Sequence, residues 1–447
     1  MGILYLSAWL DRFGVDNAVF DTTFSNKPAL YEHLRAKAPE IVAIYTNLMT
    51  KLNVLEIIRF VRNSPELENT LIVLGGPDVT HNMDDYLRAG AHLLVIGEGE
   101  QTMLDIVLAR AQGVAVADPF QNIQGIAYTL ADGSVHRTAP RDKMRDIDVL
   151  PHPARHKIDL QQYLDVWKQA HGHSTISIST QRGCPYTCRW CSTAVYGQSY
   201  RRRSPANVVA EILALRAQYS FDGIWFVDDV FTVSHKWLRE FYAELQARNV
   251  HIHFECITRA DRLDEETLHL LKDCGCFRVW IGAESGSQSV IDAMDRRVDV
   301  QQVRTMIKAA RREGIQAGTF IMLGYPGETE ADIRETVAHL CDSNPDLFTI
   351  TVAYPIKGTG LYQDVQNDLL AALPWDSSTD RDRDFKRTYP RRYYDYAVRW
   401  TVHSVHWHKA KLAGQQWQPK AFKTLIKKEI AALGMRWTRL RTHKSTN

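Results

Sequence analysis

The sequence predicts an α/β protein in which two parallel sheets follow one another along the chain. First, short β-branched runs alternate with helix-length segments over residues 1–112 and again over residues 173–366. Second, glycine-rich or acidic loops follow most of these runs, as they do at the ligand-binding edge of open α/β sheets. Third, 447 residues with 45% apolar content suffice for about two to four ordinary domains.

The first 112 residues have the pattern of a parallel sheet covered on both faces. Each β-branched run predicts a strand, and the amphipathic segments between the runs predict helices. The predicted strands are residues 15–21, 40–46, 71–74 and 93–96, and the predicted helices lie near residues 3–13, 28–37, 52–63, 83–89 and 100–112.

Polar and glycine loops follow the three main strands of this half. Taken singly, such loops mark tight turns more often than a cofactor site. In combination, Leu-Gly-Gly-Pro after one strand and Ile-Gly-Glu-Gly-Glu after the next resemble the cobalamin-binding domain that precedes many radical S-adenosylmethionine (SAM) cores. The resemblance implies cobalamin contacts from Thr46, Asn47, Gly75, Gly76, Pro77, Gly97, Glu98, Gly99 and Glu100.

This half departs from the cobalamin-binding pattern in two ways. The usual domain opens with a strand before the helix that here starts at Ile3, so either the start codon is assigned too late or the sheet is truncated. The motif Asp-x-His-x-x-Gly, whose histidine ligates cobalt in other methylcobalamin enzymes, is missing. Its absence is usual in the radical SAM branch, but it also weakens the cobalamin interpretation.

Residues 113–172 are predicted to form a connector with a hairpin around Ala131-Asp-Gly-Ser134 and a domain junction at Leu150-Pro-His-Pro-Ala-Arg155. Because its histidines are irregularly spaced on an exposed linker, we expect them to be solvated rather than to bind metal. They are His152, His156, His171 and His173.

Residues 173–366 alternate strands and helices again, and the helices have recognisable ends. Ser204 and Pro205 form an N-cap and first turn, and Gly314 closes a later helix. Periodicity alone establishes only an α/β fold here. The six predicted strands are residues 174–180, 223–229, 251–258, 277–284, 316–323 and 347–354.

Cys184, Cys188 and Cys191 follow the first of these strands with the spacing Cys-x3-Cys-x2-Cys. Three thiolates from one short loop can ligate three irons of a 4Fe-4S cube and leave the fourth iron open to another ligand. The alternatives are a zinc site, which usually takes four protein ligands, or unrelated buried cysteines. The spacing favours the cluster.

This spacing and Trp190 before the last cysteine resemble the radical SAM superfamily. The resemblance implies a partial (β/α)6 barrel with the cluster loop after its first strand. It also implies that the open iron binds the amino and carboxylate groups of SAM, and that electron transfer then yields a 5′-deoxyadenosyl radical.

Polar residues at the strand ends are predicted to hold SAM, because its ribose hydroxyls and charged aminoacyl group suit carboxylates, hydroxyls and an arginine. The resemblance implies that Asp228 and Asp229 bind the methionine amine and that Glu284 and Ser285 bind the ribose, with Arg259 as a further contact. For each of these residues the alternative is a structural role at a strand end.

Other residues near the barrel carry weaker predictions. Tyr325 and Tyr354 either touch substrate or adenine or, more commonly for such aromatics, pack. The remaining cysteines are predicted to be structural and buried, since no partner ligands for a second metal site are evident. They are Cys256, Cys274, Cys276 and Cys341.

Residues 367–447 leave the barrel pattern for helical stretches rich in Trp, His, Lys and Arg. From Lys386 onward there are 15 Lys and Arg against two Asp and Glu, which gives this tail a charge of +13. Since the whole chain has a net charge of +2, residues 1–385 carry 2 − 13 = −11. It is predicted to cap the barrel and hold an anionic substrate, to lie on an anionic membrane, to contact nucleic acid, or to be a solvated helical cap. Tyr393 to Trp400 resembles the subgroup that includes the anaerobic magnesium-protoporphyrin ester cyclase.

The bulk properties favour a cytoplasmic protein. Seven cysteines, three of them in one loop, do not resemble a disulfide framework. The segment Met1 to Leu10 lacks the basic start and cleavage site of a signal peptide. No apolar run approaches the length of a membrane span.

The resemblance implies a radical SAM enzyme that methylates an unactivated carbon from methylcobalamin, which a second SAM then remethylates. Radical oxidation or cyclisation of a tetrapyrrole-like or lipid substrate is the alternative chemistry, and a tetrapyrrole or cobalamin carrier is the non-enzymatic alternative. The expected partners are a small-molecule substrate and an electron donor such as flavodoxin or ferredoxin, with no nucleic acid.

Overall fold

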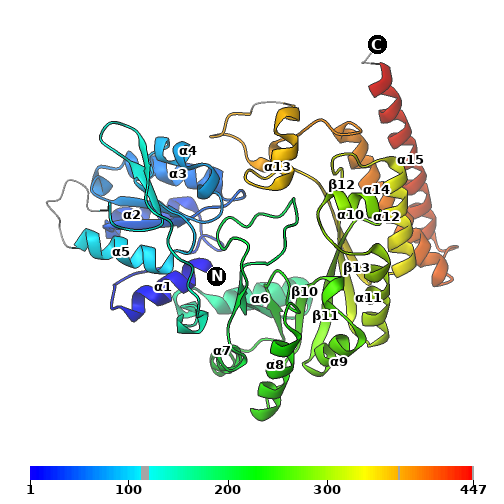
Figure 1. Cartoon of the computed structure of the whole chain (residues 1–447), viewed down its shortest axis with the longest axis horizontal. Helices are drawn as coiled ribbons and strands as arrows, with labels where there is room; N and C mark the ends of the chain where they lie inside the picture. Colours follow the sequence, from blue (N-terminus) through cyan, green and yellow to red (C-terminus); the bar gives the residue numbers. More distant parts are fainter. Residues whose placement is uncertain (112–119, 371–372, 445–447) are drawn as a thin grey trace.

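The computed structural model describes residues 1–111, 120–370 and 373–444. Parts of the predicted helix 100–112, the connector 113–172 and the C-terminal region 367–447 fall on the other residues and lie outside this description. The described chain contains a mixed five-stranded sheet next to a parallel six-stranded sheet, with a pair of long helices at the far end (Figure 1). The predicted α/β class with a helical C-terminal region is confirmed.

The N-terminal sheet has the order β1-β2-β3-β4-β5. Its first three strands are parallel, as predicted: β1 (Ile41–Tyr45), β2 (Leu71–Gly75) and β3 (Leu93–Val95). The predicted hairpin of the connector, β4 (Ile126–Thr129) and β5 (Val135–Arg137), extends this sheet in the antiparallel direction. In the described residues no strand precedes the first helix.

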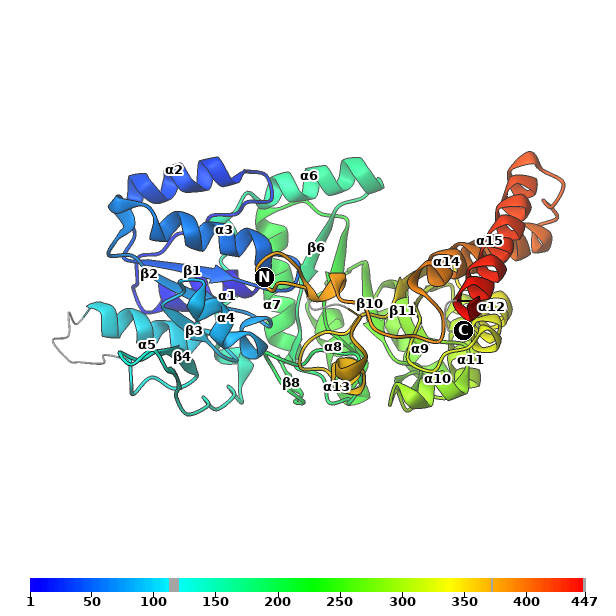
Figure 2. The same cartoon turned by 90° about the horizontal axis from the view of Figure 1, so that it is seen from above.

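Helices cover both faces of this sheet because its strands are apolar on both faces (Figure 2). Ile72 and Leu74 of β2 pack against α2 (Lys27–Lys37), α3 (Lys51–Arg62) and α4 (Met83–Arg88). Val73, between them, packs against α1 (Gly2–Arg12) and α5 (Glu100–Ala111). This alternation is the two-residue period of a strand.

The predicted strand at residues 15–21 is wrong, since this run is in no sheet. Its polar groups bind the linker instead of a strand. Lys157 Nζ donates to the Asn17 carbonyl oxygen at 2.9 Å, and Tyr163 donates to Asp21. These contacts hold the run across the linker, away from the edge of β1.

The junction at residues 150–155 is not the exposed linker that the sequence suggested. Pro153, Ala154 and Arg155 are buried, and His152 is half-buried, because this stretch fits between α1 and the barrel. His156 and His171 are exposed and His173 is half-buried. The linker then forms α6 (Leu160–His171), which leads into the barrel.

The second sheet has six parallel strands in the order β13-β12-β11-β10-β9-β6. Its two edge strands do not pair with each other, so the barrel is partial, as the resemblance implied. The strands are β6 (Thr175–Ile178), β9 (Gly223–Phe226), β10 (Phe254–Thr258), β11 (Cys276–Glu284), β12 (Gln316–Leu323) and β13 (Leu347–Val352).

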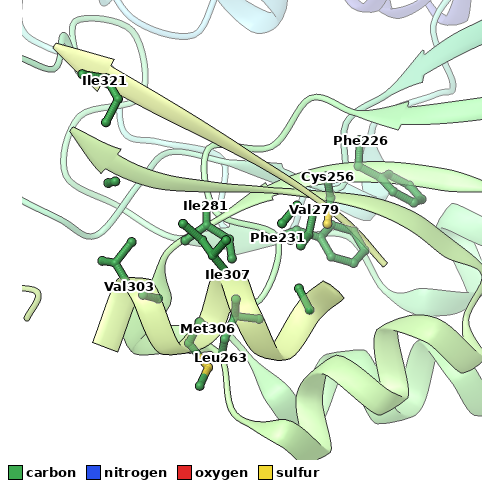
Figure 3. Close-up of a cluster of buried hydrophobic side chains, with 14 of the residues drawn as sticks. Phe226, Phe231, Cys256, Leu263, Val279, Ile281, Val303, Met306, Ile307 and Ile321 are labelled. Carbon is green, nitrogen blue, oxygen red and sulfur yellow. The ribbon is translucent and has the colours of Figure 1, made fainter. Parts of the chain in front are cut away.

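Helices pack on the outside of the barrel and form its core with the strands. Figure 3 shows Val279 and Ile281 of β11 facing Val303 and Ile307 of α11. Ser204 caps the first of these helices and Gly314 ends α11 with φ +72°, as predicted. The helices are α7 (Pro205–Gln218), α8 (His235–Ala247), α9 (Glu265–Asp273), α10 (Gln288–Ala293), α11 (Val300–Arg312) and α12 (Glu330–Ser343).

The C-terminal region packs on the barrel through α14. A short α13 (Gly360–Val365) follows β13, and α14 (Arg391–Leu412) and α15 (Pro419–Lys444) then run side by side beyond α12 (Figure 1). A Cβ on Gly434 would lie 2.5 Å from Cδ1 of Tyr396, so glycine permits the close approach of α14 and α15. Among the described residues there is no helix with the length and apolarity to cross a bilayer.

Candidate functional site

The loop with the three cysteines is closed at its base. β7 (Gln181–Arg182) pairs antiparallel with β8 (Arg201–Arg202), so residues 183–200 leave and return at one point. Gly183 has φ +81°, and a Cβ there would lie 2.4 Å from the Ser199 carbonyl oxygen. Glycine alone tolerates both the conformation and the contact. The stems therefore position the cysteines between them.

The three thiols are available for ligation. None of them is in a disulfide, Cys184 and Cys188 are half-buried and Cys191 is exposed. Burial raises the pKa of Cys184. Surrounding protein and the charge of Asp229 raise the pKa of Cys191 to about 12, although its side chain reaches solvent. In the part of the chain that is described, no three His, Cys, Asp or Glu side chains are placed to share one metal ion. A 4Fe-4S cube binds each cysteine at a different iron, so its ligands need not converge.

Two buried arginines donate to the sulfur of Cys188. Arg259 Nη1 lies 3.7 Å from Cys188 Sγ, and Arg296 Nη1 lies 3.6 Å from it. The two arginines are also hydrogen-bonded, since Arg259 Nη2 donates to the Arg296 carbonyl oxygen at 2.7 Å. The Arg259 guanidinium lies 3.8 Å from the ring centroid of Tyr186 in the cysteine loop. Positive charge next to a sulfur stabilises its thiolate form.

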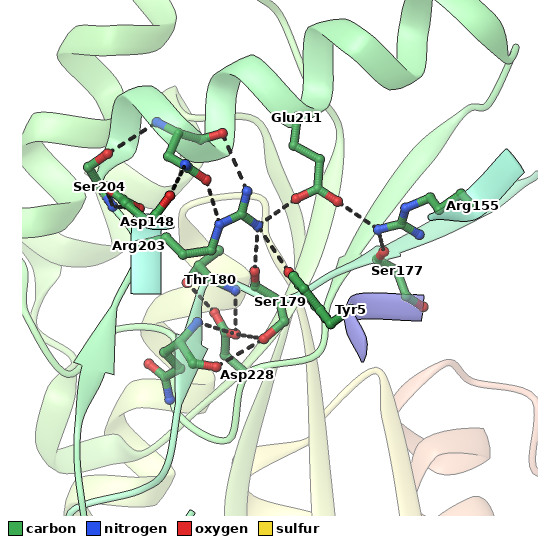
Figure 4. A network of polar contacts seen from close by, with 12 residues as sticks. Tyr5, Asp148, Arg155, Ser177, Ser179, Thr180, Arg203, Ser204, Glu211 and Asp228 are labelled. Carbon is green, nitrogen blue, oxygen red and sulfur yellow. Dashed lines mark hydrogen bonds and ion pairs between the residues drawn. The ribbon is translucent and has the colours of Figure 1, made fainter. Parts of the chain in front are cut away.

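Asp228 is placed to hold the cysteine loop. It is buried at the end of β9, and its carboxylate accepts from Thr180 N at 2.8 Å and from Gln181 N at 3.1 Å (Figure 4). The Thr180 hydroxyl also donates to it, and Ser179 Oγ donates at 3.3 Å. Burial raises the pKa of Asp228, against these donors and the charge of Arg202. The carboxylate is thus already bound to the end of β6 and the first stem of the loop.

Asp229 has the opposite environment. Its side chain is exposed at the mouth of the barrel. Desolvation and the neighbouring Asp228 raise the pKa of Asp229. Its charge in turn raises the pKa of the thiols of Cys184 and Cys191. Asp229 is therefore the better placed of the two predicted aspartates to meet a cationic group near the cysteines.

Glu284 and Ser285 at the end of β11 also differ from each other. Glu284 has φ +63° next to an irregularity in the β11–β12 register, and its carboxylate lies 3.7 Å from Arg296 Nη2. Burial raises the pKa of Glu284, although Arg296 opposes it. Such a backbone strains a non-glycine residue, and strain of this kind clusters at functional sites. Ser285 is buried, and its Oγ lies 3.1 Å from Thr336 Oγ1.

The cysteine loop is also fastened at its tip. The Arg189 amide donates to the Met294 carbonyl oxygen at 3.1 Å, and the Leu361 amide donates to the Arg189 carbonyl oxygen at 2.7 Å. The Arg189 side chain pairs with Asp364 of α13. The segment after β13 thus contacts the tip of the loop, and it also reaches the N-terminal half, where Lys357 Nζ donates to Asn82 Oδ1 at 3.0 Å.

Three consecutive arginines after the loop bind three different elements. Arg201 Nη1 donates to Glu98 Oε1 at 2.8 Å, Arg202 Nη1 donates to the Phe231 carbonyl oxygen at 2.7 Å, and Arg203 Nη1 donates to the Ser179 carbonyl oxygen at 2.9 Å. Sequence reasoning missed this set. The run Arg201-Arg202-Arg203 directly after the cysteines was the available signal.

Two of the residues predicted to bind cobalamin form the interface with the barrel. Glu98 and Glu100 are almost fully buried and pair with Arg182 of the first stem, and Glu98 also pairs with Arg201 of the second. A Cβ on Gly97 would have the Val195 carbonyl oxygen as its nearest neighbour, at 3.8 Å. The Gly-Glu-Gly-Glu loop therefore faces the cysteine loop.

The other predicted cobalamin loops lie side by side at the same edge of the N-terminal sheet. A Cβ on Gly76 would lie 2.3 Å from the Thr46 carbonyl oxygen, so glycine permits this approach. Thr46 is buried against Tyr86, with 3.1 Å between their hydroxyl oxygens, and Asn47 Oδ1 accepts from the Met49 amide at 2.8 Å. Gly75 is the last residue of β2, and Pro77 and Gly99 lie in their predicted loops.

The residues with weaker predictions are mostly structural. Tyr325 is buried and its hydroxyl lies 3.4 Å from the Ala293 carbonyl oxygen, whereas Tyr354 is half-buried. The burial predicted for the other cysteines is confirmed for Cys256, Cys274 and Cys276, while Cys341 is half-buried.

Two cavities in the described residues lie away from the cysteines. One, of about 480 Å³, lies between α1, residues 151–156 and α7. The other, of about 620 Å³, lies between α11, α12 and α14. Neither is lined by a residue predicted to bind the cluster, SAM or cobalamin.

Comparisons with known proteins agree with this fold and with the position of the three-cysteine loop. Residues 178–340 match the model of the radical SAM superfamily. The chain is 27% identical over 391 residues to an uncharacterised methyltransferase of Pyrococcus horikoshii, covering 86% of this chain and 82% of that protein. It is 28% identical over 374 residues to the anaerobic magnesium-protoporphyrin IX monomethyl ester cyclase of Rubrivivax gelatinosus, covering 81% of this chain but only 65% of the cyclase.

Two solved structures have a similar fold. One is the radical SAM methyltransferase TsrM from Kitasatospora setae with cobalamin and a 4Fe-4S cluster bound, at a TM-score of 0.68 and 19% identity over 85% of this chain and 76% of that chain. The other is the cobalamin-dependent radical SAM enzyme OxsB with aqua-cobalamin bound, at a TM-score of 0.73 and 15% identity over 92% of this chain and 64% of that chain.

The part of the chain that carries the three-cysteine loop, residues 178–340, matches the radical SAM superfamily, whose members include solved structures of this fold. The chain is an enzyme, and its fold is similar to that of cobalamin-dependent radical SAM enzymes along most of its length.

Proposed function

We propose that this protein is a cobalamin-dependent radical SAM methyltransferase that acts on an unactivated carbon of a small molecule. The observation that carries the proposal is the closed loop of Cys184, Cys188 and Cys191, with two buried guanidiniums at the Cys188 sulfur. When bound, a 4Fe-4S cluster supplies the electron that cleaves SAM, and methylcobalamin supplies the methyl group.

The residues of this chain fit the cluster. Three free thiols on one loop provide its ligands, and Arg259 and Arg296 offset the negative charge of the thiolates. Asp228 keeps the loop at the end of β6. Asp229 and Glu284 are the carboxylates left to bind the amine and the ribose of SAM, which supports their predicted roles.

The N-terminal sheet supports the proposed cobalamin site. Its loops carry Gly76 and Gly97 in the left-handed region, where backbone can approach a large flat ligand. The Gly97 loop faces the cysteine loop, which would place a corrin bound there next to the SAM site. Glu98 and Glu100 form ion pairs with Arg182 and Arg201, so we assign them to the interface rather than to direct cobalamin contact.

The partners follow from this chemistry. We infer a small-molecule substrate, a one-electron donor such as flavodoxin or ferredoxin, and a cytoplasmic address, which rests on the cysteine content. Radical oxidation or ring closure is the second candidate reaction, because the chain is 28% identical over 374 residues to the Rubrivivax cyclase. A carrier of tetrapyrrole or cobalamin is the third.

Anaerobic reconstitution separates these functions. The protein with iron, sulfide, reductant, SAM and a small-molecule extract is expected to form 5′-deoxyadenosine, and the Cys184→Ala/Cys188→Ala/Cys191→Ala variant is expected to form none. Transfer of a labelled methyl group from SAM to a product indicates methylation, and 5′-deoxyadenosine without transfer indicates oxidation or cyclisation. If the protein forms no 5′-deoxyadenosine with its cluster intact and its native substrate supplied, the enzyme proposal fails and the carrier is favoured.

A cobalamin titration tests the other cofactor. The absorption spectrum of the purified protein is recorded before and after addition of hydroxocobalamin and gel filtration. Retention of about one corrinoid per chain supports methyl transfer. A brown cluster band without retained corrinoid would contradict it and would favour the second reaction.

A further inference from the structure

An apolar stripe runs along the outer face of α15. Phe422, Ile426, Ile430, Leu433 and Leu440 are 58%, 45%, 58%, 62% and 63% exposed. The first four are spaced three or four residues apart and Leu440 follows two turns later, so all five lie on one side of the helix, within about 80° at 100° per residue. Single exposed apolar residues are ordinary, but a continuous stripe of this length marks an interaction surface.

This stripe is not the face by which α15 packs on the protein. Among the α15 residues whose burial is described, the buried ones are Ala421, Ala431, Met435 and Thr438. At 100° per residue they lie about 180° from the stripe. Figures 1 and 2 show α15 at the end of the molecule farthest from the N-terminal sheet.

Basic residues border the stripe. Lys423 and Lys427 are exposed on one side of it, and Arg436 is exposed on the other, where the acid Glu429 is exposed as well and pairs with Lys428. The chain from Lys386 onward carries +13. At the turn that joins α14 to α15, Leu412 and Trp417 are 62% and 89% exposed. Aromatic and aliphatic residues flanked by lysines and arginines are typical of helices that lie in the plane of a membrane interface.

The positive charge around the stripe distinguishes between the partners that could cover it. A second copy packed on this stripe would bring two strongly basic helices together, and like charges across an interface oppose association. A nucleic acid would neutralise the lysines but would leave the Ile and Leu side chains without apolar contact. An anionic bilayer offers phosphate headgroups to the basic borders and acyl chains to the stripe.

We propose that the stripe of α15, with its basic borders, docks this protein on the surface of anionic lipid membranes. The helix lies parallel to the bilayer plane, with the stripe among the acyl chains and the lysines and arginines at the headgroups. This inference does not depend on the reaction that the enzyme catalyses.

Vesicle co-sedimentation of the full chain tests the proposal. Vesicles of phosphatidylglycerol and phosphatidylcholine in equal parts are expected to bind the protein, and vesicles of phosphatidylcholine alone are expected to bind it much less. Raising the salt concentration is expected to weaken binding, because it screens the headgroup charge.

Two variants separate the apolar and electrostatic contributions. Ile426→Ser/Ile430→Ser/Leu433→Ser is expected to lower the partition coefficient at least tenfold, while Leu108→Ser/Val166→Ser/Leu213→Ser, at exposed apolar sites elsewhere, leaves it unchanged. Lys423→Gln/Lys427→Gln/Arg436→Gln is expected to lower it about fivefold for each charge removed. Lys236→Gln/Arg239→Gln/Arg312→Gln removes exposed charges elsewhere and is its control.

Four outcomes would overturn the proposal. They are equal binding by the stripe variant and the wild type, no sedimentation with anionic vesicles, a dimer in analytical ultracentrifugation that only the stripe variant abolishes, and tight RNA binding that the stripe variant retains. Circular dichroism melts of each variant exclude unfolding as the cause of a loss.

Discussion

At the residue scale, two adjacent carboxylates at the end of β9 have different tasks. Asp228 is buried and accepts from two backbone amides, whereas Asp229 is exposed beside the thiols. Their spacing as neighbours in the sequence could not reveal this, because successive residues of a strand end point in opposite directions. The sequence predicted both aspartates as ligands of the same amine, whereas the structure places one in the protein interior and the other at the surface.

Substitutions are expected to separate the two aspartates. Asp228→Ala is expected to lower the free energy of unfolding by about 3 kcal/mol, because it leaves buried donors unpaired. Asp229→Asn is expected to change it by less than about 0.5 kcal/mol but to weaken SAM binding at least tenfold, since a charged contact is lost. Urea denaturation and equilibrium dialysis with SAM measure both. Unchanged SAM affinity in Asp229→Asn would exclude Asp229 as a SAM ligand.

Arg296 is expected to raise the reduction potential of the cluster. Reduction adds negative charge beside Cys188, and the Arg296 guanidinium 3.6 Å from its sulfur stabilises that charge. Arg296→Gln is therefore expected to lower the potential by tens of millivolts, where about 59 mV is a tenfold change for one electron. A redox titration followed by electron paramagnetic resonance measures it. Arg297→Gln is the control, since that side chain is exposed; an equal shift in both variants would rule out a specific effect of Arg296.

At the element scale, the periodicity of apolar residues predicted most helices and strands, because each element has to bury an apolar face against a sheet or a helix. The three main N-terminal strands and all six predicted barrel strands are present in the structure. The run at residues 15–21 failed because its bonding partners, Lys157 and Tyr163, lie more than 100 residues away in the chain. The contact of Arg296 with Cys188 spans 108 residues and has no local signature.

The loop after β12 contains an acid whose ionisation opposes folding. Glu328 is buried, its Oε2 accepts from the Gly324 amide, and its Oε1 has no hydrogen-bond partner in the described chain. Burial raises the pKa of Glu328 from 4.5 to about 8. The folded state therefore favours the protonated acid, and stability is lost as pH rises from the unfolded pKa towards the folded one.

Glu328→Gln is expected to remove this pH dependence. Relative to the wild type, the variant is expected to gain up to about 4 kcal/mol of unfolding free energy between pH 5 and pH 8, because its amide does not ionise. Urea denaturation at several pH values measures the difference. The same slope of stability against pH in both proteins would show that Glu328 does not carry the effect.

At the scale of the whole molecule, a buried ion cluster joins the two sheets. Glu211 of α7 accepts from Arg155 of the linker and from Arg203 after the cysteine loop, and Arg203 also reaches the Tyr5 hydroxyl of α1 (Figure 4). Burial alone would raise the pKa of Glu211, but Arg203 and Arg155 hold it below its ordinary value of 4.5. The order of the domains was predictable from sequence, and this contact between them was not.

Acid is expected to weaken this junction. A lowered folded pKa means that the stabilisation is complete above about pH 4.5 and is lost as pH falls through the folded pKa. Glu211→Gln is expected to lower the free energy of unfolding by about 3 kcal/mol at pH 7 and by less near pH 3. Glu265→Gln, in an exposed pair with Arg312, is expected to change it by less than about 1 kcal/mol. Equal losses at both pH values would contradict the assignment.

The carboxylates of Glu98 and Glu100 hold both stems of the cysteine loop, so the two sheets are not interchangeable modules. A barrel excised at residue 173 would keep Arg182 and Arg201 without the acids that neutralise them. A chimera with the N-terminal sheet of a relative would need carboxylates at the same two positions. The cysteine loop and the sheet ahead of it are therefore expected to be exchanged and inherited together.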